Sequence, residues 1–224
     1  MLTAALLATV LAPPITLNVL FLGNSHTAMN DVPGMVRQLV QSDGSGRKFS
    51  SKLYTAAFVE ELARNGHLRR DIESRNFNVI VIQGAKLSNS HRYEYDHSGA
   101  VEIAKLSKKH GLATWLFAEW PRRGWTETDY ILKEYREIST PSGARIIPIC
   151  RAWDRLISTG FKGDLWQADG NHASLLGSFL AACTIALHVA PNPPRPPAWK
   201  PAAIDSDVDA KFKRIAREIA SDPT

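Results

Sequence analysis

The chain has 224 residues, of which 44% are hydrophobic and 22% are charged, and this composition excludes a disordered chain, a collagen-like repeat and a small disulfide scaffold. The 27 Lys and Arg residues exceed the 22 Asp and Glu residues, which gives a formal net charge of +5. A nucleic-acid site would need these cations on one face, but they are scattered between acidic residues, so no nucleic-acid partner is expected. At about 150 residues per domain, the length predicts one domain with a C-terminal extension.

The N-terminal segment, residues 1–14, is uncharged and consists of an apolar run, Met1–Ala12, followed by two prolines. A transmembrane helix needs about 20 apolar residues, so no integral membrane span is expected. The length of the run and the small residue at its end are typical of a signal peptide, although the basic start of such peptides is missing. We interpret residues 1–14 as a signal peptide, which would make the protein periplasmic or secreted, or as the N-terminal tail of a cytoplasmic protein.

From Ile15 onward, short apolar runs alternate with segments of helical periodicity, which is typical of a parallel sheet with helices on both faces. Gly111 is predicted to end one helix, and Ser174 to cap another. The predicted strands are Ile15–Leu22, Lys52–Ala56, Asn78–Gln83, Ala113–Ala118 and Arg145–Cys150. The predicted helices are Pro33–Ser42, Val59–Ser74, Ser98–His110, Thr126–Ser139, Ala152–Ser158 and Ser174–Val189.

The C-terminal part begins with Pro191–Pro201, which contains six prolines and is predicted to be an extended linker or strap. Asp205–Ser221 follows, with Val208, Phe212, Ile215 and Ile219 on one face of an amphipathic helix that is expected to dock on the domain. The expected boundaries are therefore residues 15–190 for the domain, 191–204 for the strap and 205–224 for the C-terminal helix.

Reactive groups of open parallel sheets gather at the carboxyl ends of the strands. The first strand ends in Gly23-Asn24-Ser25, a pattern that suits an exposed serine nucleophile and is also an ordinary turn with an N-capping hydroxyl. Asp169 and His172 precede the last long helix, and at this spacing the carboxylate can orient the imidazole as a base for serine. The same spacing also occurs in surface loops and helix caps.

Gln83 ends the third strand, where a carboxamide could donate to an oxyanion or close the strand end by bonding to the backbone. Together, these segments resemble the SGNH/GDSL hydrolases, a family of serine esterases with a three-layer, flavodoxin-like α/β fold and a five-stranded parallel sheet. The resemblance covers most of residues 19–189. Its motifs are VLFLGNSHT (residues 19–27), VIVIQG (residues 79–84), IPICRAW (residues 147–153), DGNH (residues 169–172) and LGSFLAA (residues 176–182).

The resemblance implies a Ser25, His172 and Asp169 catalytic triad, an acyl-enzyme intermediate and no cofactor. It also implies an oxyanion hole formed by the backbone N–H of Ser25 and the side chain of Gln83. The family's second motif contributes a glycine N–H, but the equivalent stretch YTAAF (residues 54–58) has none, so Ala56 is the candidate here. Ala173 replaces the proline that commonly follows the catalytic histidine.

The substrate implied is an acyl ester, with an acetyl group on a carbohydrate preferred because Gln83 matches the family branch that includes sugar deacetylases. A lipid or another small ester is the alternative. Tryptophan rings stack on sugars as readily as they fill a core. The candidate substrate-binding residues are Asn24, Trp120 and Arg122.

Four residues after the third strand, His91, Glu94, Asp96 and His97, match no metal motif and are interpreted as a solvated loop, so no metal is expected. Cys150 and Cys183 are interpreted as buried apolar residues, with a disulfide between them left open. Other functions compatible with the sequence are a glycan-binding module with a decayed oxyanion hole and an O-acyltransferase of the same fold. The oligomeric state is not predicted.

Overall fold

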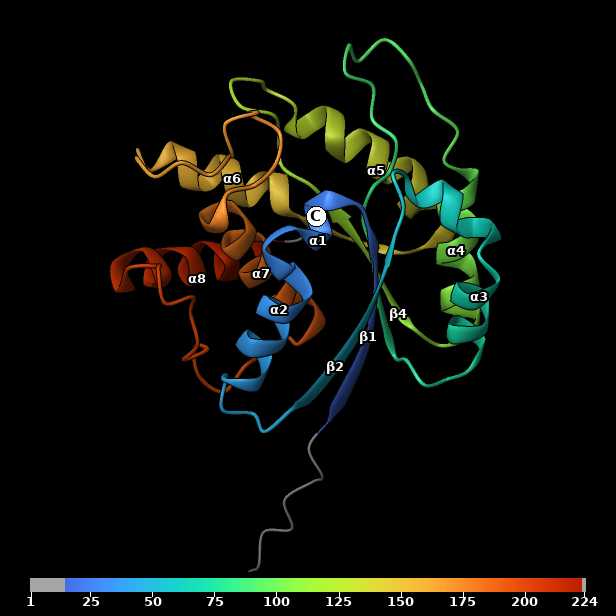
Figure 1. Ribbon diagram of the computed structural model, residues 1–224, viewed down its shortest axis with the longest axis horizontal. Coiled ribbons are helices and arrows are strands. Elements are labelled where there is room, and N and C mark those ends of the chain that lie inside the picture. The colour runs from blue at the N-terminus through green and yellow to red at the C-terminus, as the bar shows by residue number, and fades with distance from the viewer. Residues whose placement is uncertain (1–14, 223–224) are drawn as a thin grey trace, which may run out of the picture.

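The computed structural model describes residues 15–222 and contains one five-stranded sheet in the order β2-β1-β3-β4-β5, with every pair of neighbours parallel (Figure 1). This order is that of the flavodoxin-like folds, so the predicted fold class is confirmed. The strands are β1 (Thr16–Gly23), β2 (Lys48–Thr55), β3 (Val79–Ile82), β4 (Ala113–Ala118) and β5 (Arg145–Pro148).

Successive side chains of the central strands point to opposite faces of the sheet, and each face is covered by helices. On one face, Val19 and Phe21 pack in a core with residues of α2 (Val32–Gln41), α6 (Ile149–Ser158), α7 (Leu175–Val189) and α8 (Ser206–Ser221). On the other face, Leu20 and Leu22 pack with residues of η2 (Val59–Arg64), α3 (Gly66–Glu73), α4 (Ser98–Lys109) and α5 (Thr128–Ser142). Figure 1 shows this division into three layers.

Several predicted elements have different bounds in the structure, and three of the differences have a clear physical cause. The helix predicted over Val59–Ser74 is broken at Asn65, because its side chain accepts from the backbone N–H groups of His67 and Leu68 and so starts a new helix. The fifth strand stops at Pro148, which has no N–H for the ladder, and α6 begins directly afterwards. β2 starts at Lys48, four residues before the predicted start at Lys52. The prediction missed these residues because β2 is an edge strand with mostly exposed side chains, so its sequence lacks a clear alternation of apolar and polar residues.

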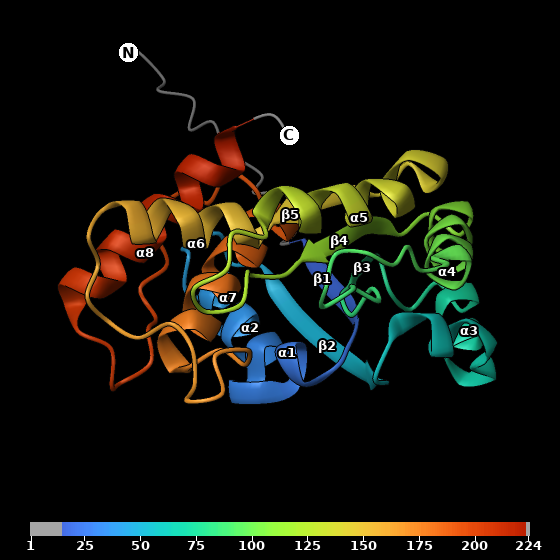
Figure 2. The same ribbon diagram turned by 90° about the horizontal axis from the view of Figure 1, so that it is seen from above.

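The C-terminal segment packs on the α2 and α7 layer, and Figure 2 shows α8 beside α6 and α7. Phe212 of α8 is completely buried in that core. The proline-rich strap, Pro191–Pro201, bonds to the end of α2 through two contacts with Ser42, which accepts from the backbone N–H groups of Ala198 and Trp199. Buried Lys213 of α8 donates to the backbone carbonyls of Pro197 and Trp199.

Cys150 and Cys183 are free and buried, and they pack in the cores on opposite faces of the sheet. A disulfide between them is therefore ruled out in this fold. Every helix within residues 15–222 is too short or too polar to span a bilayer. The predicted signal peptide or tail, residues 1–14, lies outside the described residues.

Candidate active site

The candidate nucleophile lies at the point where the strand order reverses. After β1 the chain moves to the edge strand β2 and then returns to β3 on the other side, which is the position where open α/β sheets form their ligand crevice. Ser25 is the first residue of the short helix α1 (Ser25–Ala28), and its side chain is exposed. Asn24 caps this helix, because its Oδ1 accepts from the backbone N–H of His26.

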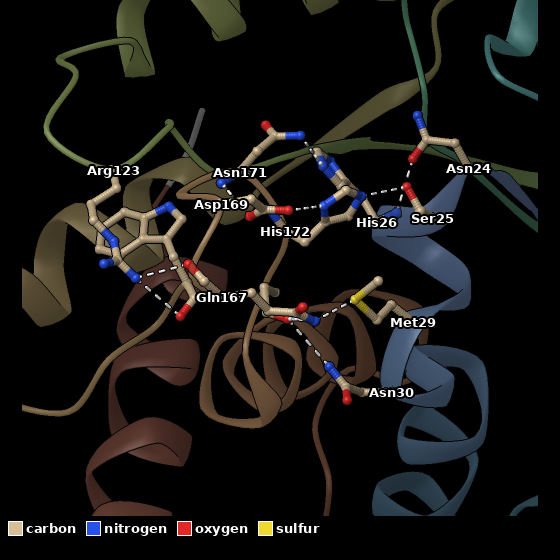
Figure 3. A network of polar contacts seen from close by, with 12 residues as sticks. Asn24, Ser25, His26, Met29, Asn30, Arg123, Gln167, Asp169, Asn171 and His172 are labelled. Carbon is tan, nitrogen blue, oxygen red and sulfur yellow. Dashed lines mark hydrogen bonds and ion pairs between the residues drawn. The ribbon is translucent and has the colours of Figure 1, made fainter.

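The serine, histidine and aspartate of the two motifs form a continuous chain of hydrogen bonds (Figure 3). Ser25 Oγ lies 2.9 Å from His172 Nε2, although 147 positions separate the two residues in the sequence. His172 Nδ1 lies 2.5 Å from Asp169 Oδ2. The carboxylate thus accepts the Nδ1–H, which leaves Nε2 to accept the proton of the serine hydroxyl.

Hydrogen bonds keep the carboxyl group of Asp169 ionised. Its Oδ1 accepts from the backbone N–H groups of Asn171 and His172, each at 2.9 Å. The side-chain bond with His172, aided by these two backbone bonds, lowers the pKa of Asp169 to about 2. The three-residue spacing therefore folds the loop around the carboxylate, so that one side chain orients both the backbone and the imidazole.

The loop that carries these residues is anchored by Arg123, which the sequence analysis did not select. Its guanidinium donates to both Asp164 carboxylate oxygens and to the carbonyls of Trp166 and Gln167, and its backbone N–H donates to the carbonyl of Gly170. Figure 3 shows Arg123 beside the loop, opposite α1. Because the partners of its guanidinium are 41 to 44 positions away, no local pattern could have identified this role.

Asn30 provides a second tie between the two motifs. The residue has a φ of 56°, a left-handed conformation that asparagine tolerates better than most side chains. Its Nδ2 donates to the carbonyl of Ala173 at 3.3 Å and to Ser178 Oγ at 2.9 Å. The segment that follows the nucleophile is thereby connected to the residue that follows His172.

His26 lies against the histidine of the chain. Its ring meets that of His172 edge to face, with the ring centres 5.3 Å apart, and its Nε2 lies 3.4 Å from Asn171 Nδ2. Burial, with a further contribution from the charge of His172, lowers the pKa of His26 to about 4. His26 is therefore neutral at neutral pH, so it adds no second positive charge beside the imidazole that would accept a proton.

Gln83 is placed differently from the oxyanion role predicted for it. Its side chain is fully buried, with Oε1 accepting from the backbone N–H of Asn24 and from Thr27 Oγ1, and Nε2 donating to Glu119 Oε2. A donor that meets a substrate oxygen has to reach the open cleft. The prediction is therefore corrected: the carboxamide lies behind the turn formed by Asn24–Thr27, here called the nucleophile turn, and bonds within the protein.

Ala56 also differs from its predicted role as an oxyanion donor. Its backbone N–H donates to the carbonyl of Gly23 at 3.1 Å, which continues the ladder between β1 and β2 and leaves no donor for a substrate. The next residue, Ala57, accepts from Asn24 Nδ2 at 3.2 Å and so lies against the nucleophile turn. Within residues 15–222, the backbone N–H groups of Ser25 and Ala57 have no protein acceptor.

The three predicted substrate-binding residues line one cavity of about 140 Å³ beside the nucleophile turn, but they are engaged by the protein. Asn24 Nδ2 donates to Ala57, and Arg122 forms an ion pair with buried Glu127. Trp120 is 3% exposed, with its ring stacked on Trp153 and further contacts from the rings of His26 and Phe117. This burial leaves no open face of the Trp120 ring on which a sugar could stack.

In the loop after β3, His91, Glu94 and Asp96 are exposed, as expected of a solvated loop, and only His97 of the four predicted residues is buried. His97 is 6% exposed and lies between Glu60 and Glu134, each 3.2 Å from one ring nitrogen, and their carboxylates raise its pKa. His91 contacts Glu127 and stacks on Tyr130. In the described part of the chain, no group of three or more His, Cys, Asp or Glu side chains is arranged to hold a metal ion.

Comparison with family models and with curated protein sequences finds no match. Three solved structures resemble the chain: a protein from Slackia heliotrinireducens assigned to the SGNH hydrolases, a DUF4886 family protein from Bacteroides uniformis and a carbohydrate esterase family 3 protein from Talaromyces cellulolyticus.

The first has a TM-score of 0.59 and 22% identity over 76% of this chain and 97% of its own. The second has a TM-score of 0.59 and 16% identity over 91% of this chain and 94% of its own. The third has a TM-score of 0.53 and 14% identity over 76% of this chain and 94% of its own. The chain therefore has the fold of the SGNH/GDSL hydrolases.

Proposed function

We propose that the protein is a serine esterase that removes a small acyl group, preferably acetyl, from an alcohol rich in hydroxyl groups, such as a carbohydrate. The observation that carries this proposal is the hydrogen-bonded chain of Ser25, His172 and Asp169 at the carboxyl edge of the sheet. The arrangement supports nucleophilic catalysis because the hydroxyl has a base and the base has an orienting carboxylate.

The reaction proceeds in two halves. Ser25 Oγ attacks the ester carbonyl while His172 Nε2 accepts the hydroxyl proton, and the tetrahedral intermediate collapses to an acyl-serine as His172 returns the proton to the leaving alcohol. Water, deprotonated by the same imidazole, then attacks the acyl-serine; the acid leaves as His172 returns the proton to Ser25 Oγ. Asp169 stays ionised throughout because its pKa is held at about 2, so it stabilises the imidazolium that forms in each half.

The oxyanion of the tetrahedral intermediate needs hydrogen-bond donors that face the cleft. We assign this role to the backbone N–H of Ser25 and, as the second donor, to that of Ala57, because neither has a protein acceptor within residues 15–222. A donor of this kind typically contributes about 100- to 1,000-fold in rate. Ala57 thereby takes the place that the sequence analysis gave to Ala56.

The preference for an alcohol rich in hydroxyl groups is supported by Asn24, Asn89 and Asn171, which line the cavity of about 140 Å³ beside Ser25 together with apolar residues such as Phe58 and Leu87. Polar groups of this kind give hydroxyl groups both donors and acceptors. One of the structural neighbours is a carbohydrate esterase, which is consistent with the same preference.

Hydrolysis of 4-nitrophenyl acetate by the wild-type protein and by Ser25→Ala tests the proposal. We expect the wild type to turn the ester over and Ser25→Ala to lose at least about 1,000-fold in kcat. Ser158→Ala, at an exposed serine that ends α6, is the matched control and should behave as the wild type. Acetylated xylan and a long-chain 4-nitrophenyl ester then compare the two substrate classes.

The outcomes separate the alternatives. A glycan-binding module would give no turnover above buffer. An O-acyltransferase would hydrolyse little until a sugar acceptor is added. Equal turnover by the wild type and Ser25→Ala would show that the hydrolysis does not use this serine, and the proposal would be abandoned.

A further inference from the structure

A buried hydrogen-bond network lies directly behind the nucleophile turn, and its members come from four elements. Gln83 follows β3, Glu119 follows β4, Tyr135 lies on α5 and Thr27 lies on α1. All four are buried, with exposed fractions between 0% and 6%. Glu119 Oε2 accepts from Gln83 Nε2 at 3.1 Å and from the Tyr135 hydroxyl at 2.6 Å.

The other end of Gln83 holds the nucleophile turn. Its Oε1 accepts from the backbone N–H of Asn24 at 3.0 Å and from Thr27 Oγ1 at 2.9 Å, so it bonds to the residues on either side of Ser25 and His26. The approach is close, because a β-carbon on Gly23 would lie 2.6 Å from this oxygen. Glycine at this position therefore allows Gln83 to reach the turn.

Glu119 determines which end of the Gln83 amide faces the turn. Above its pKa of about 7, Glu119 is a carboxylate that only accepts, so it selects the Nε2 end and leaves Oε1 for the two donors of the turn. If the amide were reversed, its NH₂ group would face the N–H of Asn24, while its oxygen would face the carboxylate. In this buried setting, unpaired groups of that kind are costly.

We infer that Glu119 is a positioning residue that acts through Gln83 to hold the Asn24–Thr27 turn in the geometry in which Ser25 meets His172. Gln83 then serves as an acceptor for the nucleophile turn and not as a donor to the oxyanion. This inference deepens the proposed function and rests on it for its effect on rate. The hydrogen bonding itself can be tested independently of activity.

An exchange of the two side chains tests the inference. Gln83→Glu alone places two carboxyl groups against each other, and we expect kcat to fall at least about 10-fold at pH 8 with little change in KM. In the double variant Gln83→Glu/Glu119→Gln, the new carboxylate accepts from the turn and from the new amide. We expect it to restore kcat to within about 3-fold of the wild type.

The double variant separates positioning from oxyanion donation because it keeps the acceptor for the turn and lacks the NH₂ group of Gln83. A folded double variant that stays as slow as Gln83→Glu overturns the inference and assigns Gln83 to the oxyanion. Ser107→Ala removes a buried hydroxyl bond within α4 and serves as the control for stability alone. It should lower the melting temperature without a change in kcat.

Hydrogen exchange of the Asn24 backbone amide provides a readout without substrate. We expect slow exchange in the wild type and the double variant, and at least about 10-fold faster exchange in Gln83→Ala. Unchanged exchange in Gln83→Ala overturns the inference even where esterase activity is present. A wild-type protein that hydrolyses no ester refutes the proposed function, and the exchange of Asn24 still decides whether Gln83 holds the turn.

Discussion

Asp169 lies at the exposed end of the Ser25–His172–Asp169 chain, with 48% of its side chain accessible, and it is one imidazole ring removed from the nucleophile. Replacing it by asparagine keeps its shape but lets the amide donate to His172 Nδ1, which favours the wrong tautomer. We expect Asp169→Asn to lower kcat for 4-nitrophenyl acetate by about 100- to 10,000-fold with a small change in KM. Asp207→Asn, in the first turn of α8, is the matched control, and a wild-type kcat in Asp169→Asn contradicts the mechanism.

The positions of Ser25, Asp169 and His172 were predictable because each motif is short and follows a strand or precedes a helix. The roles of Gln83 and Ala56 were not predictable, since each depends on the partner that its polar group finds in the fold. Glu119 is 36 positions from Gln83, and the backbone N–H of Ala56 donates to Gly23 at the end of the neighbouring strand. Trp120 failed as a stacking residue for the same reason, because Trp153 covers its ring.

At the scale of elements, the loop that carries Asp169 and His172 depends on one arginine side chain. Arg123→Met removes the donor to the Asp164 carboxylate and to the carbonyls of Trp166 and Gln167. A small displacement of His172 is costly in rate, so we expect kcat/KM for 4-nitrophenyl acetate to fall about 10- to 100-fold.

Arg155→Met is the control for Arg123→Met, because Arg155 forms an exposed ion pair with Glu218 on α8. It should leave kcat/KM within about 2-fold of the wild type, as exposed ion pairs contribute little. Equal activity of the two variants would show that the loop holds its shape without Arg123.

Lys213 connects the strap to α8. Its ammonium group donates to the carbonyls of Pro197 and Trp199 in the strap and forms an ion pair with Asp209 at 2.5 Å. Its side chain is 8% exposed, so Lys213→Met leaves buried acceptors without a partner. We expect the free energy of unfolding in urea to fall by about 3 kcal/mol. Arg214→Met, at an exposed position of the same helix, should change it by less than about 0.5 kcal/mol.

The strap lies away from the active site, so Lys213→Met should keep its wild-type kcat while it is folded. A loss of kcat in the folded variant would contradict this separation. The extended strap and the docked helix were predictable from the prolines and the amphipathic period. The break at Asn65 was not, because the apolar period continues across a residue that caps a new helix.

For the whole molecule, stability should depend on pH through Glu119. Burial raises the pKa of Glu119 from 4.5 to about 7, so the folded protein binds this proton more tightly than the unfolded chain does. The corresponding stability is fully present below pH 4.5 and is lost as the pH rises through 7. The shift corresponds to about 3 kcal/mol.

Urea unfolding of the wild type and Glu119→Gln at pH 5 and pH 8 measures this contribution. The difference in unfolding free energy between wild type and variant should fall by about 2.5 kcal/mol from pH 5 to pH 8. Burial lowers the pKa of His26 to about 4, so the contribution of His26 to the free energy of unfolding is lost as the pH falls. This contribution is present in both proteins and therefore cancels when the wild type and Glu119→Gln are compared. A difference that is independent of pH would contradict a raised pKa of Glu119.

The three-layer arrangement followed from the alternation of apolar strands and amphipathic helices, and the strand order agreed with the family resemblance. The activity depends on a narrower claim, that Ser25 is a nucleophile activated by His172. Labelling with a fluorophosphonate and peptide mapping by mass spectrometry tests this claim most directly. We expect one adduct, on Ser25, that is absent from Ser25→Ala and forms far more slowly in His172→Ala. An adduct on another residue, or none on the folded wild type, would contradict a nucleophilic Ser25.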